Sequence, residues 1–151
     1  MTEPTASSSA VRRLLLVEDS AADAQILQRV LRDTGPAKVE LRIVRDGQEA
    51  IDELTHQARE KTAVLPELVL LDLHLPKLGG LDVLRSIRKL PQTRHLPVIV
   101  WSTSRRDEDV RDVYQSGGNS YVQKPRDFPE YRRVIDGLLH YWFRIVQLPA
   151  P

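Results

Sequence analysis

The chain has 151 residues, of which 41% are hydrophobic and 28% charged, with 22 basic side chains against 21 acidic ones and no cysteine. This composition fits a single globular domain, long enough to hold a core without a metal or a disulfide. The lack of cysteine excludes disulfides, thiolate catalysis and cysteine-ligated metal centres, and the net charge of +1 argues against a nucleic-acid-binding face.

The ends of the chain differ in composition from its middle. Residues 1–10 are small and polar and lack the apolar core of a secretory signal, and no run approaches the roughly 20 apolar residues of a membrane span. We therefore expect a cytoplasmic protein that contacts no membrane. We expect a disordered leader at residues 1–11, one folded domain at 12–140, and an extension of the last helix with a tail at 141–151.

Five segments have the character of β-strands. They are Leu14–Val17, Val39–Ile43, Leu68–Leu71, Val98–Trp101 and Ser120–Gln123. The first, third and fourth are uninterrupted apolar runs, which are typical of strands buried on both faces of a parallel sheet. The second alternates apolar and polar residues, which indicates a strand near an edge, and the fifth is short enough to be the other edge.

Each strand is followed by a segment with helical spacing of its apolar residues. Ser20 and Asp23 resemble a capping box, which predicts the start of the first helix. The later helices are predicted to start at Asp46 with Glu49, near Leu81, at Ser104 with Asp107, and near Asp127. Five βα repeats predict a flavodoxin-like, doubly wound α/β fold with a five-stranded parallel sheet in the order 2-1-3-4-5.

Polar side chains come directly after four of these strands. In this fold the carboxyl ends of the strands form one crevice, so these side chains are expected to meet there. They are Glu18 and Asp19, then Asp72, then Ser102, and last Lys124. Carboxylates placed this close need a cation among them, and oxygen ligands favour a hard ion such as Mg²⁺.

The charges in this crevice suit phosphoryl transfer. Asp72 could attack a phosphorus atom as a nucleophile, while Lys124 and Ser102 would bind oxygens of the phosphoryl group. Mg²⁺ would neutralise part of the charge on those oxygens. The sequence thus predicts an aspartyl phosphate on Asp72.

At these residues the chain resembles the receiver domain of two-component response regulators, over about residues 12–140. The resemblance is carried by Glu18-Asp19, the segment from Leu68 to Pro76 with Gly79-Gly80, Ser102, Tyr121 and Lys124-Pro125. The intervals of 30, 49 and 52 residues from Asp72 to Ser102, Tyr121 and Lys124 match the usual register of the family.

The resemblance implies how the metal site is built. Asp72 would be the phosphoacceptor and Asp19 a direct ligand of Mg²⁺. Glu18, which stands where aspartate is commoner, would act mainly through metal-bound water, and the backbone carbonyl of His74 would supply a further ligand.

The resemblance also implies a conformational switch. Ser102, in place of the commoner threonine, would be the switch hydroxyl, and Tyr121 the aromatic side chain that changes rotamer with it. The peptide bond between Lys124 and Pro125 is typically cis in the family, which would place the Lys124 ammonium over the site.

By this resemblance the protein is a stand-alone response regulator that accepts a phosphoryl group from a sensor histidine kinase and signals by protein–protein contact. It would be no enzyme beyond Mg²⁺-dependent self-phosphorylation and self-dephosphorylation. The tail and the lack of an output domain resemble regulators that partner phytochrome-type kinases, which implies a bacteriophytochrome as the kinase. An alternative is a dimeric receiver-fold adaptor that works without phosphorylation. A small phosphatase, or a flavodoxin-like nucleotide or flavin binder, is disfavoured because the loop Glu18–Ala22 lacks the glycines and the run of hydroxyl and amide side chains that would wrap a phosphate group.

The C-terminal residues are unusually apolar. We expect a homodimer through Leu139, Trp142, Phe143 and Ile145, because aromatic side chains clustered at a chain end often anchor an interface. The alternative is that Trp142 and Phe143 fold back onto their own domain.

Overall fold

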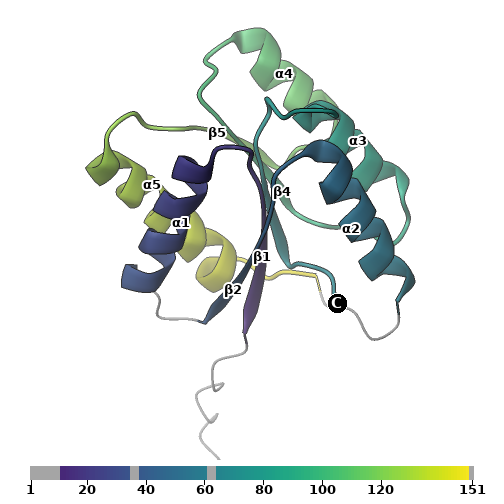
Figure 1. Ribbon diagram of the computed structural model, residues 1–151, viewed down its shortest axis with the longest axis horizontal. Coiled ribbons are helices and arrows are strands. Elements are labelled where there is room, and N and C mark those ends of the chain that lie inside the picture. The colour runs from purple at the N-terminus through teal and green to yellow at the C-terminus, as the bar shows by residue number, and fades with distance from the viewer. Residues whose placement is uncertain (1–10, 35–37, 61–63, 150–151) are drawn as a thin grey trace, which may run out of the picture.

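The five-stranded sheet has the predicted order. The computed structural model describes residues 11–34, 38–60 and 64–149, so the expected leader at 1–11 lies outside the described residues except for Val11. The strands are β1 (Arg12–Val17), β2 (Val39–Val44), β3 (Leu68–Leu71), β4 (Val98–Ser102) and β5 (Ser120–Gln123). All pairs are parallel and the order is β2-β1-β3-β4-β5, which confirms the flavodoxin-like topology (Figure 1).

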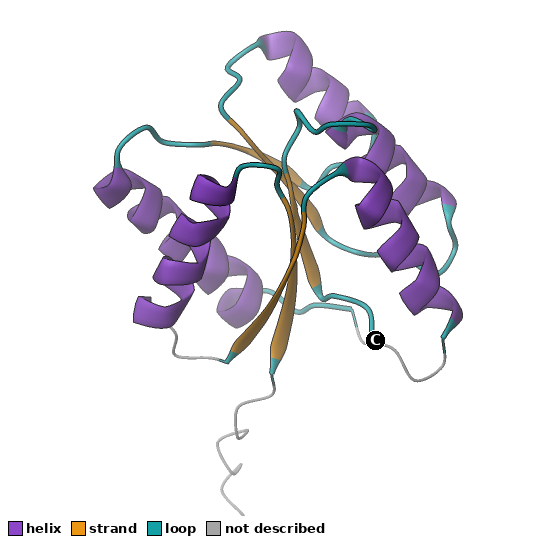
Figure 2. Cartoon of the chain, in the orientation of Figure 1, coloured by secondary structure: helices purple, strands orange, loops and turns teal. Residues whose placement is uncertain are grey.

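Helices cover both faces of this sheet. They are α1 (Ala21–Thr34), α2 (Gly47–Arg59), α3 (Gly80–Lys89), α4 (Asp107–Gln115) and α5 (Phe128–His140). Figure 2 shows α1 and α5 on one side of the strands and α2, α3 and α4 on the other. In the part of the chain that is described, no helix has both the length and the hydropathy to cross a bilayer.

Most of the predicted helix starts are confirmed. The Ser20 hydroxyl accepts from the backbone N–H of Asp23 at 3.2 Å, and the carboxylates of Asp46 and Asp127 cap α2 and α5 in the same way. The predicted cap at Ser104 is wrong. Helix α4 begins after Arg106, and the Ser104 hydroxyl instead donates to Asp109 Oδ2 at 2.5 Å.

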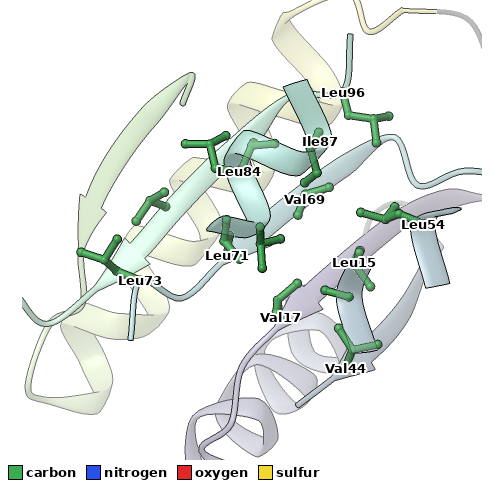
Figure 3. Packing of buried hydrophobic residues seen from close by; sticks show 14 of the residues in the cluster. Leu15, Val17, Val44, Leu54, Val69, Leu71, Leu73, Leu84, Ile87 and Leu96 are labelled. Atoms are coloured by element: carbon green, nitrogen blue, oxygen red, sulfur yellow. The ribbon is translucent and has the colours of Figure 1, made fainter. Parts of the chain in front are cut away.

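The core lies in two layers, one on each face of the sheet. Between the sheet and helices α2 and α3, side chains such as Leu15, Leu71 and Leu84 interlock with 0–2% of their surface exposed (Figure 3). On the other face Trp101 and Ile135 are buried among the leucines of β1 and β3. Each such leucine contributes about 1.5–3 kcal/mol by burial, so both layers hold the strand ends in fixed register.

The chain beyond α5 packs against its own domain. It forms a single π-helical turn, η1 (Tyr141–Ile145), in which the N–H of Val146 donates to the Tyr141 carbonyl at 3.0 Å. Phe143 is 6% exposed and lies in the core layer of α1 and α5. Arg12 holds it there, with its guanidinium 5.9 Å from the ring centroid and donating to the Phe143 carbonyl at 3.4 Å.

The four residues predicted to form a dimer interface differ in their exposure. Phe143 is part of the core rather than of a free surface, as the alternative had it, and Trp142 and Leu139 are half-buried against the same layer. Ile145 differs, with 59% of its surface exposed, and Tyr141 is 48% exposed beside it.

Candidate functional site

The carboxyl ends of four strands bring the predicted side chains together. Glu18 and Asp19 follow β1, Asp72 follows β3, Ser102 is the last residue of β4, and Lys124 follows β5. The sheet hydrogen bonding continues past the strand ends. The N–H of Asp72 donates to the Val17 carbonyl at 3.0 Å, and that of Lys124 donates to the Ser102 carbonyl at 2.8 Å. The sheet therefore fixes the backbone from which the site is built.

A glycine lets helix α3 start against the site. The N–H of Gly80 donates to the Leu73 carbonyl at 2.9 Å. A Cβ added to Gly80 would lie 2.3 Å from the backbone carbonyl oxygen of Asp72, well inside any tolerated contact. Only glycine therefore allows this close packing, which orders the loop from Asp72 to α3.

Three carboxylates form a compact oxygen-donor group. One oxygen each of Glu18, Asp19 and Asp72 lie within 4.8 Å of one another. Glu18 is 1% exposed and Asp72 8%, whereas Asp19 is exposed. The N–H of His74 donates to Asp72 Oδ1 at 3.2 Å, which fixes the orientation of the Asp72 carboxylate. A donor set made of carboxylate oxygens, two of them buried, fits a hard divalent cation.

Lys124 contacts three carboxylates at once. Its ammonium, on a side chain that is 5% exposed, donates to Glu18 Oε1, to Asp23 Oδ2 at 2.9 Å and to Asp72 Oδ2 at 3.4 Å. The contacts with Glu18 and Asp72 follow from the predicted site. The contact with Asp23 was missed, because the sequence had placed that residue only in a helix cap.

Burial and charge shift the protonation of this group. Burial, together with the hydrogen bond to Asp72, raises the pKa of Glu18 from 4.5 to about 8, and Lys124 opposes part of this rise. Burial alone would lower the pKa of Lys124, but hydrogen bonds to Glu18 and Asp23 and the charge of Asp72 outweigh it and raise the pKa. The ammonium therefore stays charged, while the raised pKa of Glu18 favours its protonated form near neutral pH.

The two predicted switch residues contact the same loop. Ser102 is fully buried, and its hydroxyl accepts from the N–H of Ser104 at 3.1 Å. Tyr121 is half-buried, and its hydroxyl donates to the Ser104 carbonyl at 2.9 Å. Both side chains thus touch the segment that leads from the site to α4.

One expectation about the backbone is wrong. The peptide bond between Lys124 and Pro125 is trans, since no cis peptide bond occurs among the described residues. Lys124 reaches Glu18 and Asp72 without it, because the hydrogen bond of its N–H to Ser102 already places the residue beside the site.

Comparisons with known proteins agree on one family. A family model described as the response regulator receiver domain matches residues 14–136. Response regulator Rcp1 of Synechocystis sp. is 39% identical over 137 residues, which are 91% of this chain and 92% of that protein. The phosphorylated cyanobacterial phytochrome response regulator RcpA has a solved structure that matches with a TM-score of 0.87 at 33% identity, over 93% of this chain and 100% of that chain. The Mn²⁺-bound form of Rcp1 matches with a TM-score of 0.84 at 38% identity, over 92% of this chain and 99% of that chain.

Proposed function

Because the chain belongs to the response regulator receiver domain family, we propose that it accepts a phosphoryl group from the phosphohistidine of a histidine kinase onto Asp72. Members of the family are signalling domains, so phosphorylation is expected to change the surface of the protein rather than to release a metabolite. The observation that carries the proposal is the placement of Asp72, 8% exposed, between a carboxylate cluster and the Lys124 ammonium.

The residues of the site divide the chemistry among them. As a carboxylate oxygen of Asp72 bonds to phosphorus, the bond from phosphorus to the histidine nitrogen breaks, and its electron pair returns to the imidazole. The N–H of His74 orients Asp72 through Oδ1. Lys124 offers its ammonium to a phosphoryl oxygen, and the Ser102 hydroxyl donates to another.

We propose Mg²⁺ as the metal of this site, held by Asp19 and Asp72, by Glu18 and by the backbone carbonyl of His74. When bound, the ion supplies neutralisation of the charge on the transferring phosphoryl group. The Mn²⁺-bound form of the relative Rcp1 supports a divalent ion in this family.

The signal would leave through the segment that Ser102 and Tyr121 share. A phosphoryl group that draws the Ser102 hydroxyl towards Asp72 releases the N–H of Ser104, and Tyr121 then loses its carbonyl partner as the loop moves. The surface of α4, β5 and α5 changes with it and is read by protein contact. We propose a phytochrome-type histidine kinase as the donor, and the description of RcpA as a phytochrome response regulator supports this.

A fluorescence titration separates this function from that of an adaptor that works without phosphorylation. Trp101 is 1% exposed, and its ring meets that of Tyr131 edge-on at 5.1 Å, while the Tyr131 hydroxyl donates to the Asp23 carbonyl at 3.4 Å. Trp101 is thereby linked to the site by two contacts. The variant Trp142→Phe leaves it as the one tryptophan of the chain.

We expect a saturable change in Trp101 emission with Mg²⁺ and a second one with beryllium fluoride, a mimic of the phosphoryl group. Asp72→Asn should abolish the second change. If the protein with Asp72 unchanged gives no response to beryllium fluoride in fluorescence or in thermal melting, the phosphoacceptor function is refuted and the adaptor function is favoured.

We also propose that the chain forms a homodimer through the exposed part of η1. Ile145 and Tyr141 are two of the large apolar side chains that the fold leaves in solvent, 59% and 48% exposed. Ile145→Asp should convert a dimer to a monomer in light scattering, while Val64→Asp, a change at an exposed apolar site elsewhere, should not. A monomeric wild type, or an unchanged mass for Ile145→Asp, would refute the dimer.

A further inference from the structure

Asp23 is held in place from three directions. Its backbone N–H donates to the Ser20 hydroxyl at 3.2 Å, and its carbonyl accepts from the Tyr131 hydroxyl at 3.4 Å. Its carboxylate accepts from Lys124 at 2.9 Å. In a capping box the side chain at this position would turn back to the start of its own helix, but here it turns to a residue 101 positions away. The contact with Lys124 is therefore a built feature of the site.

The ammonium of Lys124 has no free donor in this arrangement. An ammonium carries three N–H bonds, and the three carboxylate partners Glu18, Asp23 and Asp72 accept them all. Asp23 lies closer than Asp72, at 2.9 Å against 3.4 Å. Before Lys124 can bind an oxygen of a phosphoryl group on Asp72, it must give up or weaken one of these contacts.

Asp23 is the partner that can be released at least cost. The side chain of Glu18 is 1% exposed, so without Lys124 its buried Oε1 would lose its hydrogen-bond donor and water could not replace it. The side chain of Asp23 is 30% exposed, so water can replace Lys124 there. Lys124 can therefore leave Asp23 for an incoming anion, because water then solvates the Asp23 carboxylate.

We propose that Asp23 is a positioning residue that holds Lys124 in its resting place and competes with the phosphoryl group for the Lys124 ammonium. This inference rests on the proposed phosphoacceptor function of Asp72. Competition from the Asp23 carboxylate lowers the affinity of Lys124 for the phosphoryl group. It therefore reduces the stability of the phosphorylated form relative to the unphosphorylated form.

The test compares two variants that remove the same charge from the same helix. Asp23→Asn removes the carboxylate beside Lys124. Asp33→Asn removes one from the other end of α1, where it pairs with Arg132 at 3.3 Å and is 44% exposed. The affinities for Mg²⁺ alone and for beryllium fluoride in saturating Mg²⁺ are measured by Trp101 fluorescence.

We expect Asp23→Asn to bind beryllium fluoride about tenfold more tightly than wild type, the scale expected for removing one partly exposed carboxylate from beside a bound anion. Its affinity for Mg²⁺ should stay within about twofold, because Asp23 is not among the clustered carboxylates. Asp33→Asn should match wild type, and Asp23→Glu should restore the wild-type affinity. If Asp23 only stabilised the fold, its replacement would not change the affinity for beryllium fluoride while leaving the affinity for Mg²⁺ nearly constant.

Three results would overturn the inference. One is an Asp23→Asn protein that binds beryllium fluoride as wild type does or more weakly, and another is an equal effect of Asp33→Asn. The third is that Asp23→Ser, tested in case the asparagine variant unfolds, binds the mimic no more tightly than wild type. Failure of the proposed function itself looks different, because the wild-type protein then shows no binding of beryllium fluoride at all.

Discussion

Replacing Lys124 with methionine removes the ammonium that contacts the buried carboxylates Glu18 and Asp72, at nearly constant side-chain volume. In the metal-free protein Asp72, 8% exposed, is then left without its cation, and Glu18 loses its strongest opposing charge. Breaking a buried ion pair by removing one partner costs about 3–5 kcal/mol.

The cost should fall at the lower end of that range, about 3 kcal/mol, for two structural reasons. Glu18 already holds a proton near neutral pH, because its pKa is raised to about 8. Asp23 has 30% of its side chain in solvent, which screens the charge it is left with. A loss of about 3 kcal/mol lowers the melting temperature of a domain of this size by roughly 10 °C.

The assay is thermal melting at pH 7 in EDTA, followed by circular dichroism. Lys77→Met is the matched control, since Lys77 is 69% exposed and pairs with Asp46 at 3.5 Å, and it should change stability by less than about 0.5 kcal/mol. Added Mg²⁺ should restore much of the stability lost in Lys124→Met, because a cation again offsets the carboxylates. If Lys124→Met melts within 2 °C of wild type, roughly the change expected for 0.5 kcal/mol, the ammonium does not hold this cluster together.

Three further predictions concern the carboxylates and the far end of α3. At a pH above about 8, where Glu18 is ionised, Asp72→Asn in EDTA should melt a few degrees above wild type in scanning fluorimetry, because it removes the buried carboxylate beside Glu18; a lower melting temperature would contradict their repulsion. Glu18 keeps its proton up to about pH 8 in the folded, metal-free protein, whereas the unfolded chain loses this proton near pH 4.5. The free energy of unfolding should therefore be highest below pH 4.5 and should fall as the pH rises from there to about 8. Over the same range calorimetry should show Mg²⁺ binding that tightens by up to about tenfold per pH unit, since the ion displaces that proton, and a pH-independent affinity would be inconsistent with a protonated Glu18. Arg88→Ala should lower the free energy of unfolding in urea by about 2–3 kcal/mol, because its guanidinium donates to three backbone carbonyls and to Asn119 Oδ1, whereas the exposed Arg85→Ala should have little effect; similar midpoints for the two would contradict this.

The fold could be predicted because its signals are local. Three uninterrupted apolar runs, such as Leu68–Leu71, identified the strands buried on both faces, and the alternation in Val39–Ile43 placed β2 at an edge. The start of α4 could not be predicted in this way. Ser104 is a residue type that often caps helices, but its hydroxyl donates to Asp109 instead. The sequence pattern does not distinguish a capping serine from one that donates to a nearby carboxylate.

The sequence predicts those site residues whose positions depend only on where a strand ends. Glu18, Asp72 and Lys124 each follow a strand directly, and the order of the strands brings them together. Asp23 and Phe143 could not be predicted, because their partners lie far away in sequence. Asp23 satisfies a capping pattern equally well whether or not its carboxylate turns to Lys124, and Phe143 contacts Arg12, 131 residues earlier, and packs among apolar residues of distant elements.

The most direct test of the account is the intact mass of the protein after incubation with acetyl phosphate and Mg²⁺, followed by peptide mapping. The account predicts the addition of one phosphoryl group, on Asp72, which requires Mg²⁺ and is absent in Asp72→Asn. An unmodified wild-type protein under conditions where Mg²⁺ is bound, or a phosphoryl group on any other residue, would contradict it.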